Sequence, residues 1–158
     1  MPAARVTRLT RGAEALEELR KCCKRENGAE VRRRYVSSVN MLPDGVIPFS
    51  AQMGILWSRM DVRHKVEIVR FTVAFEREEL DPDSPEDCMK ALELGREIAN
   101  ANTPDCQSVV SMDARDGKVV IDILTNDVRM SDCKSVGLKA CTRSRFQHLV
   151  DKVYAAYA

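Results

Sequence analysis

Alternating apolar and polar residues mark several short strands along this chain, and helical spacing of apolar residues marks the segments between them. The clearest alternation lies in Lys65–Phe75, where every second residue from Val69 to Phe75 is apolar. The same patterns predict strands over Ala4–Leu9, Arg34–Asn40 and the two arms of Val109–Val128, and helices over Gly12–Lys24, Phe49–Met60, Ser84–Asn100 and Lys139–Tyr157. Strands joined by short turns and helices predict an α+β fold, a mainly antiparallel sheet with helices packed largely on one face.

Length and composition are those of an ordinary folded domain. A chain of 158 residues can bury a sizeable core, so we expect a single domain spanning residues 1–158. No apolar run approaches the roughly 20 residues of a membrane helix, and no apolar stretch follows the basic N-terminus. The cysteines show neither a CxxC pair nor zinc-finger spacing. We therefore expect a cytoplasmic protein without a membrane partner and with reduced thiols.

The net charge of +1 conceals a strong asymmetry along the chain. Residues 1–36 carry ten basic and five acidic side chains, whereas residues 76–105 carry three basic and ten acidic ones. The basic part includes the consecutive residues Arg32, Arg33 and Arg34. Guanidinium groups bind phosphate well, so these three residues are the candidate DNA-binding residues. Solvated faces of unrelated helices would explain the same asymmetry.

The hairpin Val109–Val128 is the most informative segment. Taking Ala114–Gly117 as its turn, period-two alternation sends Val119, Ile121 and Ile123 to the face covered by helices. The opposite face then carries the charged residues Asp113, Lys118 and Asp122. Because buried charges are costly, we expect solvent or a bound polyanion to meet them.

A family pattern runs through Tyr35–Asn40 (YVSSVN), Val66–Phe75, Ser84–Ala99 (SPEDCMKALELGREIA), Gln107–Val110 and Gly117–Val128. In order and wording these segments resemble the plasmid mobilization relaxases, the nicking enzymes of conjugation in the HUH endonuclease superfamily. The resemblance covers nearly the whole chain and implies a relaxase-like domain, shorter than full-length relaxases. In that family, histidines on one sheet face hold a divalent cation that polarises a phosphate of single-stranded DNA. An N-terminal tyrosine then attacks that phosphate.

Carried over without gaps, the family's histidines and aspartate fall on Asp113, Arg115, Lys118, Val120 and Asp122, and its terminal asparagine is retained as Asn126. None of the family's metal positions holds a histidine. Lysine repels a cation and valine has no donor atom. At ~3.4 Å per residue, we expect Asp113 and Asp122 to lie about 10–14 Å apart at opposite ends of the hairpin, too far for one ion. These positions are therefore predicted to be vestigial, with no catalytic residue, metal or cofactor.

The family's nucleophile is also missing from its expected place. The stretch that matches its context in the first helix, Ala15–Leu19, contains no tyrosine. Tyr35 is the nearest alternative nucleophile, although a tyrosine in a strand is most often a packing residue. His64 and His148 fit surface or capping positions better than ligand positions.

Three hypotheses remain open from the sequence. The first is a relaxase-like protein of a mobile element that lacks nicking activity. It would act in conjugative transfer by binding single-stranded or origin-of-transfer DNA, or as an accessory to other relaxosome proteins. The second is an active single-strand nickase with a rearranged site using Mg²⁺ or Mn²⁺ and Tyr35. The third is a protein-interaction module without enzymatic activity. The site residues favour a protein that is not an enzyme.

Overall fold

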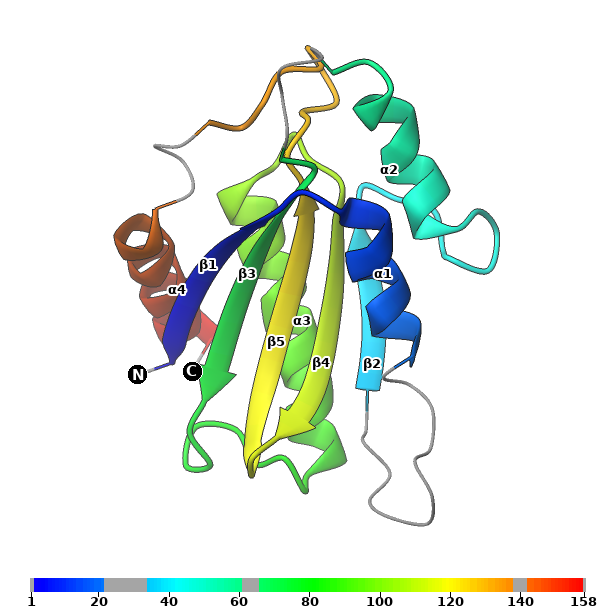
Figure 1. Ribbon diagram of the computed structural model, residues 1–158. Coiled ribbons are helices and arrows are strands. Elements are labelled where there is room, and N and C mark those ends of the chain that lie inside the picture. Colours follow the sequence, from blue (N-terminus) through cyan, green and yellow to red (C-terminus); the bar gives the residue numbers. More distant parts are fainter. Residues whose placement is uncertain (1, 22–33, 61–65, 138–141, 158) are drawn as a thin grey trace.

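Five strands and four helices form within the residues that the computed structural model describes, 2–21, 34–60, 66–137 and 142–157. In chain order they are β1 (Ala3–Leu9), α1 (Gly12–Lys21), β2 (Arg34–Val39), α2 (Phe49–Trp57), β3 (Ile68–Phe75), α3 (Pro85–Asn102), β4 (Ser108–Arg115), β5 (Lys118–Asn126) and α4 (Arg143–Tyr157). The strands make one sheet in the order β1-β3-β5-β4-β2, with every neighbouring pair antiparallel (Figure 1). The α+β fold predicted from the sequence is confirmed.

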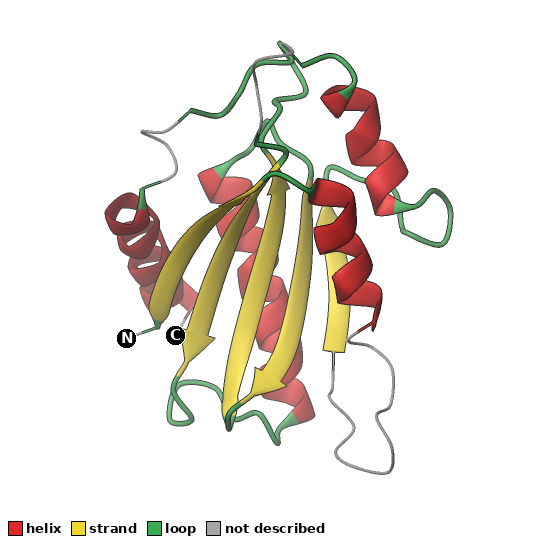
Figure 2. Ribbon diagram, viewed as in Figure 1, coloured by secondary structure: helices red, strands yellow, loops and turns green. Residues whose placement is uncertain are grey.

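The two long helices, α3 and α4, pack on one face of the sheet, which we call the α3 face (Figure 2). Its core contains the apolar side chains that alternate along β3, β4 and β5, among them Phe71, Val110 and Ile121. Helix α3 begins where the sequence predicts, because the Ser84 hydroxyl accepts a hydrogen bond of 3.3 Å from the Asp87 backbone N–H. This face is the main hydrophobic core of the molecule.

The opposite face, which we call the α1 face, is partly covered by α1 and α2. Leu16 of α1 and Met53 of α2 pack there with Ile68, Val109 and Leu124 of the sheet. The predicted assignment of Asp113, Lys118 and Asp122 to the face away from α3 is correct, because Val119, Ile121 and Ile123 all lie in the α3-face core. However, α1 lies over this side of the sheet, so the face is less open than the sequence pattern suggests (Figure 1).

The β4–β5 turn is shorter than predicted. It consists of Asp116 and Gly117, with φ values of +53° and +72°, in place of the expected four residues from Ala114 to Gly117. Two consecutive residues with positive φ are typical of a type I′ hairpin turn, for which Asp-Gly is a preferred pair. The strands consequently extend to Arg115 and Lys118, which face each other.

Two predicted helices have different ends in the structure. Helix α2 ends at Trp57, before the predicted Met60, and α3 continues to Asn102, beyond the predicted Asn100. Helix α4 is described from Arg143 onward. Among the described residues, no helix has the length and apolar character needed to cross a membrane.

Candidate functional site

An ionic network lies on the α1 face where the family resemblance places a metal. Asp122 Oδ1 accepts hydrogen bonds from Arg70 Nε at 3.2 Å and from Thr72 Oγ1 at 2.8 Å. Its second oxygen, Oδ2, accepts from Arg115, whose Nε also lies 3.4 Å from Asp113 Oδ2. The side chains of Asp113 and Asp122 are 1 % and 2 % exposed, whereas those of Arg115 and Arg70 are 31 % and 37 % exposed. Two buried carboxylates are thus held by two guanidiniums that reach the surface.

Strand register brings these residues together and corrects the separation expected from the sequence. Asp113 lies opposite Val120, and Asp122 lies opposite Ser111. The two aspartates are therefore diagonal neighbours on one face, a relation that places Cα atoms about 7–8 Å apart. The expectation of about 10–14 Å is wrong because it assumed the longer turn and placed Asp113 opposite Lys118.

The charge state of Asp122 follows from its neighbours. Burial raises the pKa of this carboxyl, but the hydrogen bond and charge of Arg70 lower it, as do the charge of Arg115 and the hydroxyl of Thr72. The lowering contributions prevail, so the pKa of Asp122 lies below its ordinary value. Asp122 is an anion at neutral pH and supports the positive charge of both arginines.

A cavity of about 430 Å³ opens between α1 and this network. Its charged lining combines Arg8 and Arg11 with Glu14 and Glu18 on one side, and the arginines and aspartates of the network on the other. Positive and negative groups are equal in number in this lining. The cavity is therefore polar without having the excess of one charge that marks a simple anion or cation site.

The residues at the family's metal positions do not fit a divalent cation. Val120 has no donor atom, and the carboxylates of Asp113 and Asp122 already face the Arg115 guanidinium. A cation would have to displace this positive group. Lys118 bonds Glu76 at 2.8 Å at the end of the sheet, and this hydrogen bond raises the pKa of the ammonium group. Within the described ranges, no three His, Cys, Asp or Glu residues are grouped so as to hold a metal ion.

Asn126, the retained family asparagine, is buried in a structural network at the end of β5. Its side chain accepts a hydrogen bond from Trp57 Nε1 at 3.0 Å and from the Val128 backbone at 3.0 Å. It donates to Gln107 Oε1 at 3.0 Å and to the Met53 carbonyl at 3.4 Å. These bonds connect α2 to the end of β5, so Asn126 stabilises the packing of α2 against the sheet.

The remaining sequence candidates lie elsewhere. Tyr35 pairs with Met112 and packs against the α3-face core, on the side of the sheet away from Asp113. Arg32 and Arg33 lie outside the described residues. The backbone of Arg34 is described, and it pairs with Asp113 at the start of β2.

Sequence reasoning missed Arg70 and Thr72 of the network. A signal for Arg70 was present, since it is a charged residue inside the most strongly apolar strand of the chain. A charge at such a position predicts a buried partner. The partner's identity was not available from the strand itself, because Asp122 is 52 positions away in sequence.

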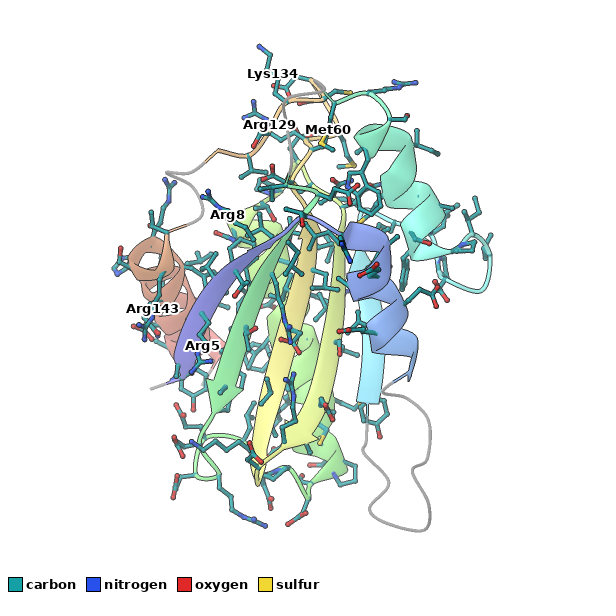
Figure 3. The ribbon with its side chains drawn as sticks, in the orientation of Figure 1. Arg5, Arg8, Met60, Arg129, Lys134 and Arg143 are labelled. Atoms are coloured by element: carbon teal, nitrogen blue, oxygen red, sulfur yellow. The ribbon has the colours of Figure 1, made fainter. Side chains whose placement is uncertain are left out.

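A basic surface was predicted only in part, because Arg129, Lys134 and Arg143 come from segments far from the basic N-terminal part of the chain. It comprises Arg5, Arg8, Arg129, Lys134 and Arg143, and we call it the basic rim (Figure 3). Arg143, at the start of α4, donates from Nε to the Ala4 carbonyl of β1 at 3.1 Å, which joins α4 to this edge strand. The acidic β3–α3 segment and the Asp116–Gly117 turn lie at the end of the sheet away from Arg129 and Lys134 (Figures 1 and 3). Arg5 lies nearer to that acidic end, because it pairs with Thr72 of β3.

No protein-family profile matches the chain, and no curated protein matches it in sequence. Among solved structures, the chain resembles the MobM relaxase domain (MOBV; Mob_Pre) bound to plasmid pMV158 oriT DNA in a Mn-bound crystal structure. The TM-score is 0.62 and the sequence identity is 9 %, and the match covers 99 % of this chain and 86 % of that one. A structure of the same relaxase domain with 26-nt pMV158 oriT DNA matches with a TM-score of 0.62, 9 % identity, and coverage of 99 % and 87 %. At such low identity the likeness establishes the fold, and the chain is therefore an α+β domain with the relaxase fold.

Proposed function

We propose that this protein is a relaxase-like DNA-binding protein of a mobile element that lacks metal-dependent nicking. It binds single-stranded or origin-of-transfer DNA and acts in conjugative transfer directly or as an accessory to other relaxosome proteins. The observation that carries this proposal is the series of exposed basic side chains along the β1 edge of the sheet, Arg5, Arg8 and Arg143 (Figure 3). The fold shared with a domain bound to oriT DNA supports the choice of DNA as the polyanion.

The basic rim supports binding to a phosphate backbone. Arg5, Arg8, Lys134 and Arg143 are exposed (Figure 3). Arg5 and Arg8 belong to the edge strand β1, Lys134 to the segment after β5, and Arg143 begins α4. In the segment after β3, Glu76, Glu78 and Asp83 are exposed acids. A polyanion approaching this molecule is attracted to the basic rim and repelled by these acids. The charge distribution thus favours binding of DNA along the rim, even though the net charge is only +1.

The site chemistry supports a binding role in place of strand cleavage. On the α1 face, a catalytic cation would need the carboxylates of Asp113 and Asp122 as ligands, but Arg115 already neutralises them. Tyr35, the alternative nucleophile, packs on the other face of the sheet, so it does not approach this network. Phosphodiester cleavage needs a nucleophile within reach of the phosphorus atom of the same phosphate that an electrophilic group activates.

A binding and cleavage assay tests the proposal. The full chain is incubated with labelled single-stranded and duplex origin DNA over a series of salt concentrations, with chelator, Mg²⁺ or Mn²⁺. We expect DNA binding that weakens as the salt concentration rises and that is equally strong with chelator, Mg²⁺ and Mn²⁺. We expect neither a nick nor a covalent adduct. A strand-specific nick that requires metal would support the active nickase hypothesis. Absence of binding at low salt would support the interaction-module hypothesis.

A further inference from the structure

We propose that the outer edge of β2 pairs with the same edge of a second copy of this chain, so that two sheets join into one. Strand β2 lies at the opposite edge of the sheet from β1 (Figure 1). An unpaired strand edge is a template on which another strand can form hydrogen bonds. This inference concerns association of the protein with itself and does not require that it bind DNA.

Strand register shows which backbone groups of β2 point away from the sheet. The N–H of the last residue of β5 donates to the Gln107 carbonyl at 2.8 Å, and from there the residues of β4 alternate between bonding β5 and bonding β2. Val110 is among those that bond β2, and its partner is Ser37. Val36 and Ser38, on either side of Ser37, therefore direct their N–H and C=O groups outward.

The two edges of the sheet differ in how such outward groups are satisfied. On β1, the Ala4 N–H donates to Gln147 Oε1 at 2.9 Å, and the Ala4 carbonyl accepts from Arg143 Nε at 3.1 Å, so α4 closes that edge. Among the described residues, none forms a hydrogen bond with the outward backbone groups of Val36 or Ser38. Strand β2 is therefore the edge at which a further strand can pair.

The surroundings of this edge are apolar. Beside the strand, a cavity of about 490 Å³ is lined by side chains of α1, β2 and the start of α2, among them Leu16, Leu19 and Phe49. Five of the seven exposed large apolar side chains in the described part of the chain belong to β2, α2 or the segment between them: Val36, Leu42, Val46, Ile47 and Ile55. Such a concentration of exposed apolar side chains is characteristic of a protein interface.

The scarcity of charge favours a second copy as the occupant. Although 31 % of the chain is charged, residues 35–57 contain one charged side chain, Asp44. Two copies bring identical side chains together, so they associate most easily where few charges are present. The described lining of the cavity also contains no lysine or arginine that would bind a phosphodiester.

Antiparallel pairing about a two-fold axis satisfies both strands equally. With Val36 opposite the partner's Val36, the backbone of Arg34 lies opposite the partner's Ser38. Outward groups then meet outward groups, and no two like charges are opposed. The joined sheet carries β1, with its basic side chains, at both outer edges.

Sedimentation equilibrium of the full chain over a range of concentrations tests the proposal. We expect a mass of twice 17.8 kDa at high concentration that falls toward 17.8 kDa on dilution. Val36→Lys places two ammonium groups opposite each other and should raise the dissociation constant of the dimer at least about tenfold. Val36→Pro removes an outward N–H but no bond to β4, and should have a similar effect. Circular dichroism determines whether both variants fold.

Met89→Lys is the matched control, because Met89 is 47 % exposed and Val36 is 40 % exposed. Met89 lies one turn before Glu93, which accepts a hydrogen bond from Tyr157 of α4, so it faces away from β2. This variant should leave the dissociation constant unchanged within about twofold. Amide exchange measured by NMR provides a second readout. The Val36 and Ser38 amides should exchange more slowly at high concentration, whereas the Ser37 amide, which bonds β4, should not change.

Two results would overturn the inference. One is a mass of 17.8 kDa at every concentration up to about 1 mM, which would leave the edge to a strand of another protein. The other is a dimer whose dissociation constant neither Val36 variant changes, because the two copies would then join elsewhere. If the variants do not fold, the amide exchange of the unchanged protein decides: slowing at Val36 and Ser38 supports the pairing, and exchange independent of concentration contradicts it.

Discussion

Asp122 is the residue on which the ionic network depends. It accepts hydrogen bonds from Arg70, Thr72 and Arg115. Buried ion pairs gain their stability only when each charge is matched, because desolvation offsets much of the attraction. A change at Asp122 would leave two arginines side by side without their shared anion.

We predict that Asp122→Asn destabilises the protein by about 2–3 kcal/mol. This is less than the loss for a fully enclosed pair, because both arginines reach solvent. Urea unfolding followed by circular dichroism measures the change. Asp83→Asn, which alters an exposed aspartate beside Arg77, is the control and should change stability by less than about 0.5 kcal/mol. Equal effects of the two variants would contradict the buried role of Asp122.

The pKa of Asp122 also predicts how stability depends on pH. Its value in the folded protein lies below the ordinary 3.8, so the unfolded chain binds the proton more readily. The stability that Asp122 contributes is therefore present above pH 3.8 and is lost as the pH falls through the folded-state pKa. We expect the free energy of unfolding to decrease less steeply below about pH 4 in Asp122→Asn than in the unchanged protein. Parallel curves for the two proteins would contradict this assignment.

At the scale of elements, the close approach of α3 to the sheet depends on a glycine. A Cβ atom at Gly95 would lie 2.5 Å from Val110 Cγ1 and 2.9 Å from Ile121 Cγ2. Those two side chains belong to β4 and β5, the strands that carry Asp113 and Asp122 on their other face. Packing of α3 thus supports the site from behind the sheet.

We predict that Gly95→Ala destabilises the protein by about 1–3 kcal/mol. The clash with the sheet outweighs the better helix propensity of alanine, which is worth about 1 kcal/mol. Gly54→Ala in α2 is the matched control, since its Cβ would meet nothing closer than Trp57 Cε3 at 3.8 Å. That variant should be more stable by up to about 1 kcal/mol. The two melting temperatures, measured by calorimetry, should move in opposite directions.

At the scale of the whole molecule, the distribution of charge determines where a polyanion would bind. The basic rim follows the β1 edge and the segment after β5, and the exposed acids Glu76, Glu78 and Asp83 lie in the segment after β3 (Figure 3). Binding to phosphates releases counterions, so each phosphate that the protein neutralises adds to the dependence of affinity on salt.

We predict that the double variant Arg5→Gln/Arg8→Gln has a lower affinity for single-stranded DNA. Its plot of log affinity against log salt concentration should also be less steep, by about 0.7 for each phosphate that is no longer neutralised. Arg77→Gln/Lys90→Gln removes the same number of positive charges at the acidic end and should leave both quantities nearly unchanged. Fluorescence anisotropy over a salt series measures them. Equal decreases in the two variants would indicate a general effect of net charge and would contradict a role for the rim.

The strands, their faces and the start of α3 could be predicted from the sequence, because alternation, helical spacing and capping are local properties. The absence of histidines from the family's metal positions is likewise a property of the sequence. Tertiary structure alone decided the contacts of Asp113 and Asp122. Alternation assigns a side chain to a face but does not set strand register, and the two-residue turn set that register here. Arg70 reaches Asp122 only through the pairing of β3 with β5, which joins segments far apart in the chain.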